Sequence, residues 1–304
     1  MNSILEDFKL AFKTGNVLNQ IIIINVVIFA IFGVLGVFFT LGGERALFST
    51  ITSFLSLPAD FGQLIIQPWS LITYFFFHQG FFHILWNMLF LYWFGRIISE
   101  YLGQNKLMGL YVWGGIGGGL LYLMAYNVFP YFQSAVPNSY LLGASGGVVA
   151  IVVGAATFQP NYVVPLFLLG PVKLKYIAAV TVLLSIIQST GNNAGGEIAH
   201  LGGALVGYIM MKQLQKGNDW SVPLAKFIIW VKSFFKPQPT IKVSYKRKQK
   251  ASSTKQTSSA RSAKSSFEKT PQDEIDRILD KISEKGYDAL SKEEKQKLFN
   301  ASKD

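Results

Sequence analysis

The sequence predicts an all-α membrane protein, with a bundle of six helical segments followed by a polar, basic tail. Half of the 304 residues are hydrophobic, and the net charge of +11 is concentrated near the C-terminal end. A helix needs about 20 apolar residues to span a bilayer. Apolar stretches of roughly this size occur near residues 20–40, 81–99, 106–129, 144–158, 176–190 and 198–215.

Composition divides the chain into five parts. We expect a cytoplasmic amphipathic N-terminus, a six-helix membrane domain, an interfacial amphipathic segment, a disordered basic linker and a small helical C-terminal element. These parts cover residues 1–19, 20–215, 216–239, 240–269 and 270–304. The first apolar stretch shows no small-residue cleavage site, so we expect an uncleaved anchor rather than a removable signal peptide. The chain has no cysteine, which excludes disulfides and thiolate metal sites.

The fourth segment is short. Gly143 precedes it and Pro160 follows it, which leaves about fifteen residues, or roughly 22 Å of helix, against a hydrocarbon core of about 30 Å. Its first residues must therefore lie below the membrane surface, where protein or water has to satisfy the backbone. The long connection 41–80 is rich in Phe, Leu and Ile, and we expect it to be partly helical; a plain surface loop is the alternative.

Two polar residues with complementary chemistry occur inside these apolar segments. Ser145 lies in Gly143-Ala144-Ser145-Gly146, and His200 lies in Ala199-His200-Leu201-Gly202-Gly203. An ionisable side chain at bilayer depth is costly and is by default functional. A serine and a histidine can act as nucleophile and base. The alternative is that Ser145 and its glycines only serve helix packing.

Glycines accompany both polar residues. Gly143 and Gly146 let the backbone bend around Ser145 and aim N–H groups at a reacting carbonyl. Gly203 and Gly207 form a GxxxG pattern, which lets two helix backbones approach closely.

All three histidines of the chain lie at the starts of apolar segments, namely His78, His83 and His200. His83 and Asn87 are four residues apart and therefore share a helix face. A merely structural role fits His78 better than it fits all three. Three histidines without nearby carboxylate pairs make a poor ligand set, so we expect no metal and no cofactor.

On these motifs the chain resembles the rhomboid family of intramembrane serine proteases, over roughly residues 15–215. The resemblance implies a serine-type endopeptidase that cleaves transmembrane or membrane-anchored proteins near the external membrane face. It implies that Ser145 is the nucleophile, His200 the general base, and His83 and Asn87 the side chains that help to bind the oxyanion. His78 matches a family position with a structural role.

The chain departs from the family pattern at two places. Many members have an aromatic residue four positions after the nucleophile, where it stacks on the histidine, and this chain has Val149 there. Many also have a Trp-Arg dipeptide in the first connection, which this sequence lacks. Neither change removes a reacting group.

Two other functional classes remain open as alternatives. A non-catalytic relative that binds client transmembrane helices would need neither Ser145 nor His200, so the presence of both argues against it. A small-solute transporter would need inverted repeats and buried ion-coordinating carboxylates, which the sequence does not display.

The nearest carboxylate to His200 in the sequence is Glu197, three residues earlier. Soluble serine hydrolases usually orient their histidine with a carboxylate. We expect Glu197 to lie where the segment emerges into water, because burying it would be expensive. The resemblance implies a Ser-His dyad that acts without a carboxylate.

Basic residues predict the orientation of the bundle. One predicted side carries Lys9, Lys13, Arg96, Lys106, Lys173, Lys175, Lys212 and Lys216, and the other carries only Arg45. We therefore expect both termini in the cytoplasm and the candidate site open to the external side. We expect a multi-pass protein of a bacterial inner membrane. Similar tails accompany some bacterial members of the family, which implies regulation from the cytoplasm.

The tail is expected to contain ordered and disordered parts. Residues 220–235 alternate aromatic and aliphatic residues with lysines, typical of an interfacial helix. Residues 240–269 lack apolar periodicity and favour disorder, with a lipid leaflet rather than nucleic acid as partner. Thr270-Pro271 and a capping box from Ser291 to Glu294 predict two short helices. Such a hairpin buries little core, so we expect it to self-associate or to dock on a cytoplasmic partner.

Overall fold

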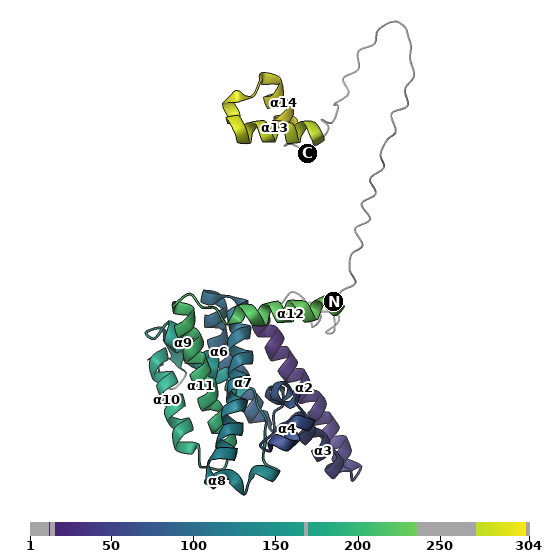
Figure 1. Ribbon diagram of the computed structural model, residues 1–304, viewed down its shortest axis with the longest axis vertical. Coiled ribbons are helices and arrows are strands. Elements are labelled where there is room, and N and C mark those ends of the chain that lie inside the picture. The colour runs from purple at the N-terminus through teal and green to yellow at the C-terminus, as the bar shows by residue number, and fades with distance from the viewer. Residues whose placement is uncertain (1–11, 13–15, 167–169, 236–271, 302–304) are drawn as a thin grey trace. The chain divides into compact units, whose positions relative to one another are not determined.

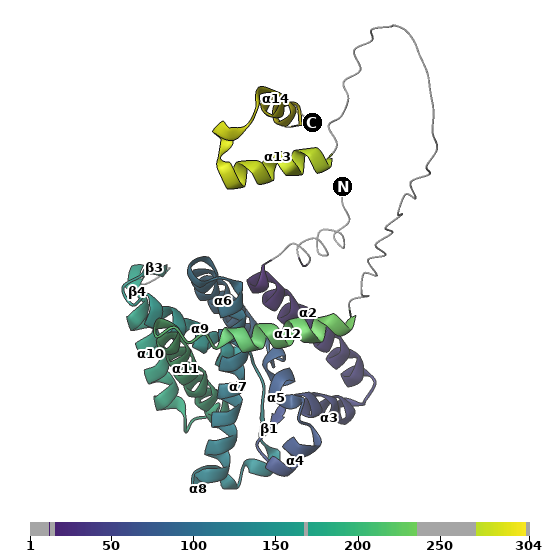
Figure 2. The same ribbon diagram turned by 45° about the horizontal axis from the view of Figure 1, so that its top comes forward.

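The computed structural model describes residue 12 and residues 16–166, 170–235 and 272–301. The chain divides into two compact units, residues 1–239 and residues 240–304. The described part of the first unit is a bundle of helices, and that of the second is a pair of short helices (Figures 1 and 2). Most of the N-terminal part predicted at 1–19, and the whole predicted linker 240–269, lie outside the described residues.

Each of the six apolar segments predicted from the sequence is a helix. They are α2 (Val17–Leu41), α6 (Phe81–Leu102), α7 (Gln104–Val128), α9 (Ser145–Phe158), α10 (Leu174–Gln188) and α11 (Ala194–Gln215). Among the described helices, α2, α6 and α7 are long and apolar enough to cross a membrane, and α9 and α10 are shorter apolar helices. The 14 residues of α9 extend about 21 Å, less than a hydrocarbon core of about 30 Å. This set of apolar helices is compatible with a multi-pass membrane protein.

Helices α7, α9 and α11 pack against one another at the centre of the bundle. Glycines bring their backbones together. A Cβ atom on Gly114 of α7 would lie 2.3 Å from the Cβ of Ala150 in α9. One on Gly118 would lie 2.7 Å from the carbonyl oxygen of Ala199 in α11. Small residues therefore set the spacing of these three helices, of which α9 carries Ser145 and α11 carries His200.

The connection between α2 and α6 is partly helical, as the sequence predicted. It contains α3 (Arg45–Leu55), α4 (Phe61–Ile66), α5 (Ser70–Thr73) and a 3-10 turn at Tyr74–Phe76. Side chains fasten these pieces to one another, since the Trp69 indole N–H donates to the carbonyl of Phe54 at 3.0 Å and the Thr73 hydroxyl donates to that of Leu55 at 2.7 Å.

The fold is mostly helical rather than purely helical, because it also contains two short antiparallel strand pairs. In one, β1 (Leu57–Pro58) pairs with β2 (Tyr140–Leu141), and Leu57 lies opposite Leu141. In the other, β3 (Val163–Leu166) pairs with β4 (Gly170–Lys173). Between α7 and β2 lie α8 (Pro130–Gln133) and a 3-10 turn at Val136–Asn138. The first pair ties the α2–α6 connection to the segment that leads into α9.

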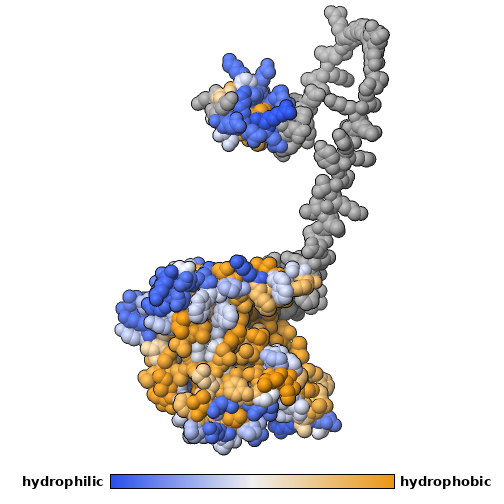
Figure 3. All heavy atoms as spheres, viewed as in Figure 1, coloured by the Kyte–Doolittle hydropathy of each residue, from blue (hydrophilic) through white to orange (hydrophobic). Residues whose placement is uncertain are grey.

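The surface of the first unit carries an apolar band. On the face seen in Figure 3, hydrophobic residues cover the middle of the bundle and polar residues gather at its two ends. Helix α12 (Ser221–Phe235) crosses one of these ends (Figures 1 and 2). Its start is fastened to α7, because Lys106 pairs with Asp219 at 2.7 Å and the Trp113 indole N–H donates to the carbonyl of Trp220.

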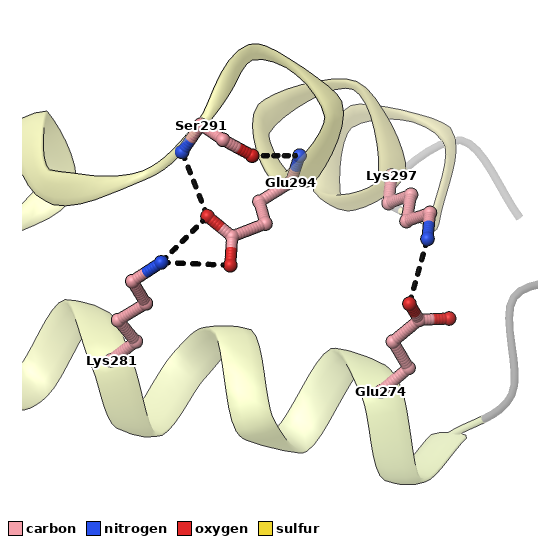
Figure 4. Close-up of polar contacts among 5 residues, drawn as sticks. All are labelled: Glu274, Lys281, Ser291, Glu294 and Lys297. Carbon is pink, nitrogen blue, oxygen red and sulfur yellow. Dashed lines mark hydrogen bonds and ion pairs between the residues drawn. The ribbon is translucent and has the colours of Figure 1, made fainter.

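The described residues of the second unit form a small hairpin. Helix α13 (Gln272–Lys285) is followed by a 3-10 turn at Tyr287–Ala289 and by α14 (Lys292–Ala301). Figure 4 shows the polar contacts that join the two helices. Lys281 of α13 binds both carboxylate oxygens of Glu294 at 2.9 Å, and Lys297 of α14 binds Glu274 at 2.7 Å. The capping box predicted at Ser291 and Glu294 is confirmed, since each residue accepts a backbone N–H of the other.

Candidate active site

Ser145 is the first residue of α9 and follows a backbone turn that requires glycine. Gly143 has a φ of +128°, which side-chain-bearing residues rarely adopt. Its N–H donates to the carbonyl of Tyr74 at 3.0 Å, so the turn is held by the α2–α6 connection. The first N–H groups of a helix have no acceptor within the helix. The backbone N–H of Ser145 therefore lies where it can donate to a bound oxygen.

Two glycines place α11 directly on α9. A Cβ atom on Gly203 would lie 2.0 Å from the carbonyl oxygen of Gly146, and one on Gly207 would lie 2.2 Å from that of Ala150. Real Cβ atoms do not approach an oxygen this closely, so a larger residue at either position would push the helices apart. The close approach expected from the GxxxG pattern is confirmed.

Ser145 and His200 lie on the two sides of this helix junction. Gly146, which follows Ser145, faces Ala199, which precedes His200: a Cβ atom on Gly146 would lie 3.5 Å from the Ala199 carbonyl oxygen. No hydrogen bond joins the Ser145 hydroxyl to His200 among the described residues. Catalytic hydrogen bonds are often long in unliganded enzymes and shorten when substrate binds.

His83, at the start of α6, borders the same space as Ser145. A Cβ atom on Gly143 would lie 2.9 Å from His83 Nε2 and 3.7 Å from Ser145 Oγ. Asn87, one turn further along α6, is 7% exposed and donates one amide N–H to the carbonyl of His83 at 2.9 Å. An amide carries two such protons, so the second is available to another acceptor.

His78 supports the turn before Ser145 from outside the helices. Its Nε2 lies 3.4 Å from the N–H of Ala144 and accepts that proton, and its ring meets that of His83 at a centroid distance of 5.0 Å. Burial and the neighbouring His83 lower the pKa of His78 to about 3. The neutral ring keeps its acceptor nitrogen, and the contact is consistent with the structural role expected for this residue.

His200 is held by two groups that sequence reasoning did not assign to the site. Its Nδ1 lies 3.1 Å from the hydroxyl of Ser185 in α10 and 3.1 Å from Oε2 of Glu197 in α11. The Glu197 side chain is only 13% exposed. The expectation that Glu197 emerges into water is therefore wrong: the carboxylate turns along its own helix toward the imidazole.

A comparison with protein families identifies the domain that contains these residues. The family model described as the rhomboid domain matches residues 66–216. The chain contains a rhomboid domain. The matched stretch of this rhomboid chain contains Ser145, His200, His83 and Asn87, as well as Ser185 and Glu197. A second model, described as a family of unknown function, matches residues 267–304.

Curated relatives of this rhomboid chain come from Arabidopsis thaliana. RHOMBOID-like protein 12, mitochondrial, is 34% identical over 161 residues, which cover 49% of this chain and 47% of the relative. Rhomboid-like protein 16, chloroplastic, is 30% identical, and Rhomboid-like protein 17, chloroplastic, is 29% identical, each over 49% of this chain and 50% of the relative. The chain thus matches about half the length of these relatives.

A cavity of about 760 Å³ opens beside the candidate site, between α2, α3 and the segment before α6. His78 and Gln79 line its polar part, and Phe32 and Phe48 belong to its apolar wall. Ser145 and His200 are not among its lining residues, so this cavity does not hold the candidate reacting groups. The described residues contain no group of three or more His, Asp or Glu side chains suited to a metal ion.

Proposed function

We propose that this rhomboid chain is an intramembrane serine endopeptidase that cleaves transmembrane or membrane-anchored proteins with Ser145 and His200. The observation that carries the proposal is the glycine-mediated contact of α9 with α11, which brings the segments of the two residues together. A binding module needs neither a free hydroxyl nor an imidazole at such a contact. The family match supports the same reaction class.

The proposed reaction is acyl transfer followed by hydrolysis. Ser145 Oγ attacks the carbonyl carbon of the scissile bond while His200 takes the hydroxyl proton. When the tetrahedral intermediate collapses, the C–N bond breaks and His200 returns the proton to the leaving amine. Water then attacks the acyl carbon while His200 takes its proton. The ester C–O bond breaks, the carboxylate product leaves, and His200 returns the proton to Ser145 Oγ.

Donors for the oxyanion come from two elements. We assign the N–H of Ser145, at the start of α9, and the second amide N–H of Asn87, with His83 beside them. Donors fixed in a low-dielectric site stabilise the transition state without having to reorganise. Loss of one such donor typically costs about a hundredfold or more in rate.

We also propose that α2, α6, α7, α9, α10 and α11 all span the membrane. The short α9 would then start below the surface, in the recess where water meets the peptide bond. Lys106 pairs with Asp219 just before α12, and Lys212 and Lys216 lie at the end of α11, which α12 follows in the chain. Arg45 begins α3, and Figure 1 shows α3 at the opposite end of the bundle from α12. This asymmetry supports a cytoplasmic side at α12 and a site that opens externally. The inner membrane of a bacterium is the proposed location.

The direct test is cleavage of a single-pass substrate by the purified chain in detergent or liposomes. We expect cleavage by the wild type and none by Ser145→Ala or His200→Ala at equal folded concentration. Val34→Ala, on the exposed face of α2, is the matched control and should cleave normally. A folded wild type that binds several such substrates without cutting any would favour the non-catalytic alternative.

A further inference from the structure

The contacts of His200 constrain which ring nitrogen carries its proton. An ionised carboxylate only accepts hydrogen bonds, so the nitrogen that faces it must donate. Glu197 Oε2 faces Nδ1 at 3.1 Å. The tautomer that satisfies this contact carries the proton on Nδ1 and leaves the lone pair on Nε2. A general base needs that lone pair to take the hydroxyl proton of the nucleophile.

We propose that Glu197 is a positioning residue for His200: its carboxylate, assisted by Ser185, fixes the Nδ1–H tautomer and orients the ring. This inference rests on the proposed function, and it adds to the Ser-His dyad expected from the sequence a carboxylate one helical turn before the base. The same carboxylate would stabilise the imidazolium that forms when His200 accepts a proton.

The surroundings of Glu197 fit a fixed, ionised carboxylate. A buried carboxylate costs several kcal/mol unless donors surround it, and this side chain has three neighbours that hydrogen-bond to it: His200, Ser185 and Asn193. They come from α10, from α11 and from the residue before α11. Ser185 is itself 2% exposed, which is costly for a hydroxyl in an apolar helix unless it has a partner. The cluster is therefore built around His200 from two helices.

A purely structural role competes with this proposal. Glu197 lies in the first turn of α11, where an acidic side chain also favours the helix dipole. That role would make Glu197 matter for stability without any effect on the tautomer of His200. The experiment must therefore include a measurement that stability alone does not change.

The kinetic arm compares four chains on the same substrate: wild type, Glu197→Gln, Glu197→Asp and the matched control Glu100→Gln. Glu100 is also hydrogen-bonded, to Arg96, but lies on the exposed part of α6 far along the chain from the site. We expect Glu197→Gln to lower kcat by about a hundredfold or more, with KM changed by less than about threefold. The kcat of Glu197→Asp should be at least about tenfold higher than that of Glu197→Gln. The kcat of Glu100→Gln should match that of the wild type.

The spectroscopic arm reads the tautomer directly. Histidine labelled with nitrogen-15 gives three imidazoles in this chain, and His200→Ala assigns the signal of His200 by its loss. In the wild type at neutral pH we expect a protonated Nδ1 and an unprotonated Nε2. In Glu197→Gln, whose amide can donate to Nδ1, we expect the proton to shift partly or wholly to Nε2.

The outcomes separate this proposal from the proposed function. A wild-type His200 with its proton on Nε2 overturns the positioning role, and this result does not need any variant to fold. Unchanged kcat and tautomer in Glu197→Gln overturn it as well. If the wild type cleaves nothing, the proposed protease function fails, and the tautomer still supports or overturns the role of Glu197.

Discussion

At the scale of single residues, the site depends on positions where a backbone carbonyl of one helix touches the backbone of another. The clearest is Gly203, whose Cβ position lies 2.0 Å from the Gly146 carbonyl oxygen. Helix α11 can hold His200 beside α9 only while this contact stays closed. The distance between the candidate base and nucleophile is therefore set by the absence of a methyl group.

This contact gives a stability and activity prediction. Gly203→Ala should destabilise the fold by roughly 1–3 kcal/mol, the usual range for overpacking, and should also reduce cleavage because α11 must shift. Thermal unfolding in detergent and the cleavage assay measure the two effects. The control is Gly33→Ala in α2, where a Cβ atom meets nothing within 4 Å. Equal melting temperatures and rates for both variants would contradict the packing account.

The buried, neutral His78 predicts a pH effect on stability. Its folded pKa of about 3 lies below its ordinary value of 6.5, so between these values the unfolded chain binds more protons than the folded one. Stability should therefore be full above pH 6.5 and decline as the pH falls toward 3. His78→Gln, which cannot take up this proton, should flatten that decline in urea unfolding curves measured at several pH values. An unchanged slope would show that His78 is not kept neutral.

Sequence reasoning named several residues of the candidate site and misjudged the burial of another, Glu197. Ser145 and His200 were predictable because each is polar in an apolar segment and sits beside glycines. Ser185 is polar in an apolar segment too, but no motif surrounds it. Glu197 was misjudged because the cost of burying a carboxylate depends on its donors, and one of these, Ser185, comes from another helix. That pairing is a tertiary fact that the linear sequence does not display.

At the scale of elements, the apolar segments predicted their helices, while the strand pairs could not be foreseen. Leu57 and Leu141 are paired across more than eighty residues, and a two-residue strand is too short to show alternation. This pair nevertheless matters for the site, because β2 leads into Gly143 and Ser145. The capping box of the C-terminal hairpin could be predicted from the sequence, because it is a local motif. The ion pairs between the two helices of the hairpin could not be predicted.

The contacts between α13 and α14 predict which side chain stabilises the start of α14. Glu294 accepts from Lys281 and also from the backbone N–H of Ser291, so one side chain joins α13 to α14 and caps α14 (Figure 4). Glu294→Ala should speed amide hydrogen exchange in the first turn of α14 in the full chain. Glu293→Ala, its neighbour, removes the same charge without either of these contacts and should have a smaller effect. Equal exchange in the two variants would contradict the role given to Glu294.

At the scale of the whole molecule, the structural division between residues 239 and 240 falls where the composition changes from apolar to polar and basic. Composition alone could therefore indicate two parts. The rhomboid match begins at residue 66 and omits α2 and α3, although the β1–β2 pair joins their connection to the site. The packing of α2 and α3 on the bundle is a property of the folded chain that motif spacing does not reveal.

The charge asymmetry of the bundle predicts its orientation. Reporter domains inserted after Gly103 and after Gly217 should report the cytoplasm, because Lys106, Lys212 and Lys216 flank these sites. A reporter near Val136 should report the external side. Accessibility to a membrane-impermeant reagent checks each position, and the chain's lack of cysteine allows single-cysteine variants as an independent readout. External signals at both 103 and 217 would invert the proposed topology.

The central claim is that Ser145 is a nucleophile activated by His200, and covalent labelling tests it most directly because no natural substrate is needed. A fluorophosphonate reacts with an activated serine, and mass spectrometry locates the adduct. We predict a single adduct on Ser145 in the wild type, lost in Ser145→Ala and reduced by at least about a hundredfold in rate in His200→Ala. A folded wild type that forms no adduct, or one that reacts equally fast without His200, would contradict the claim.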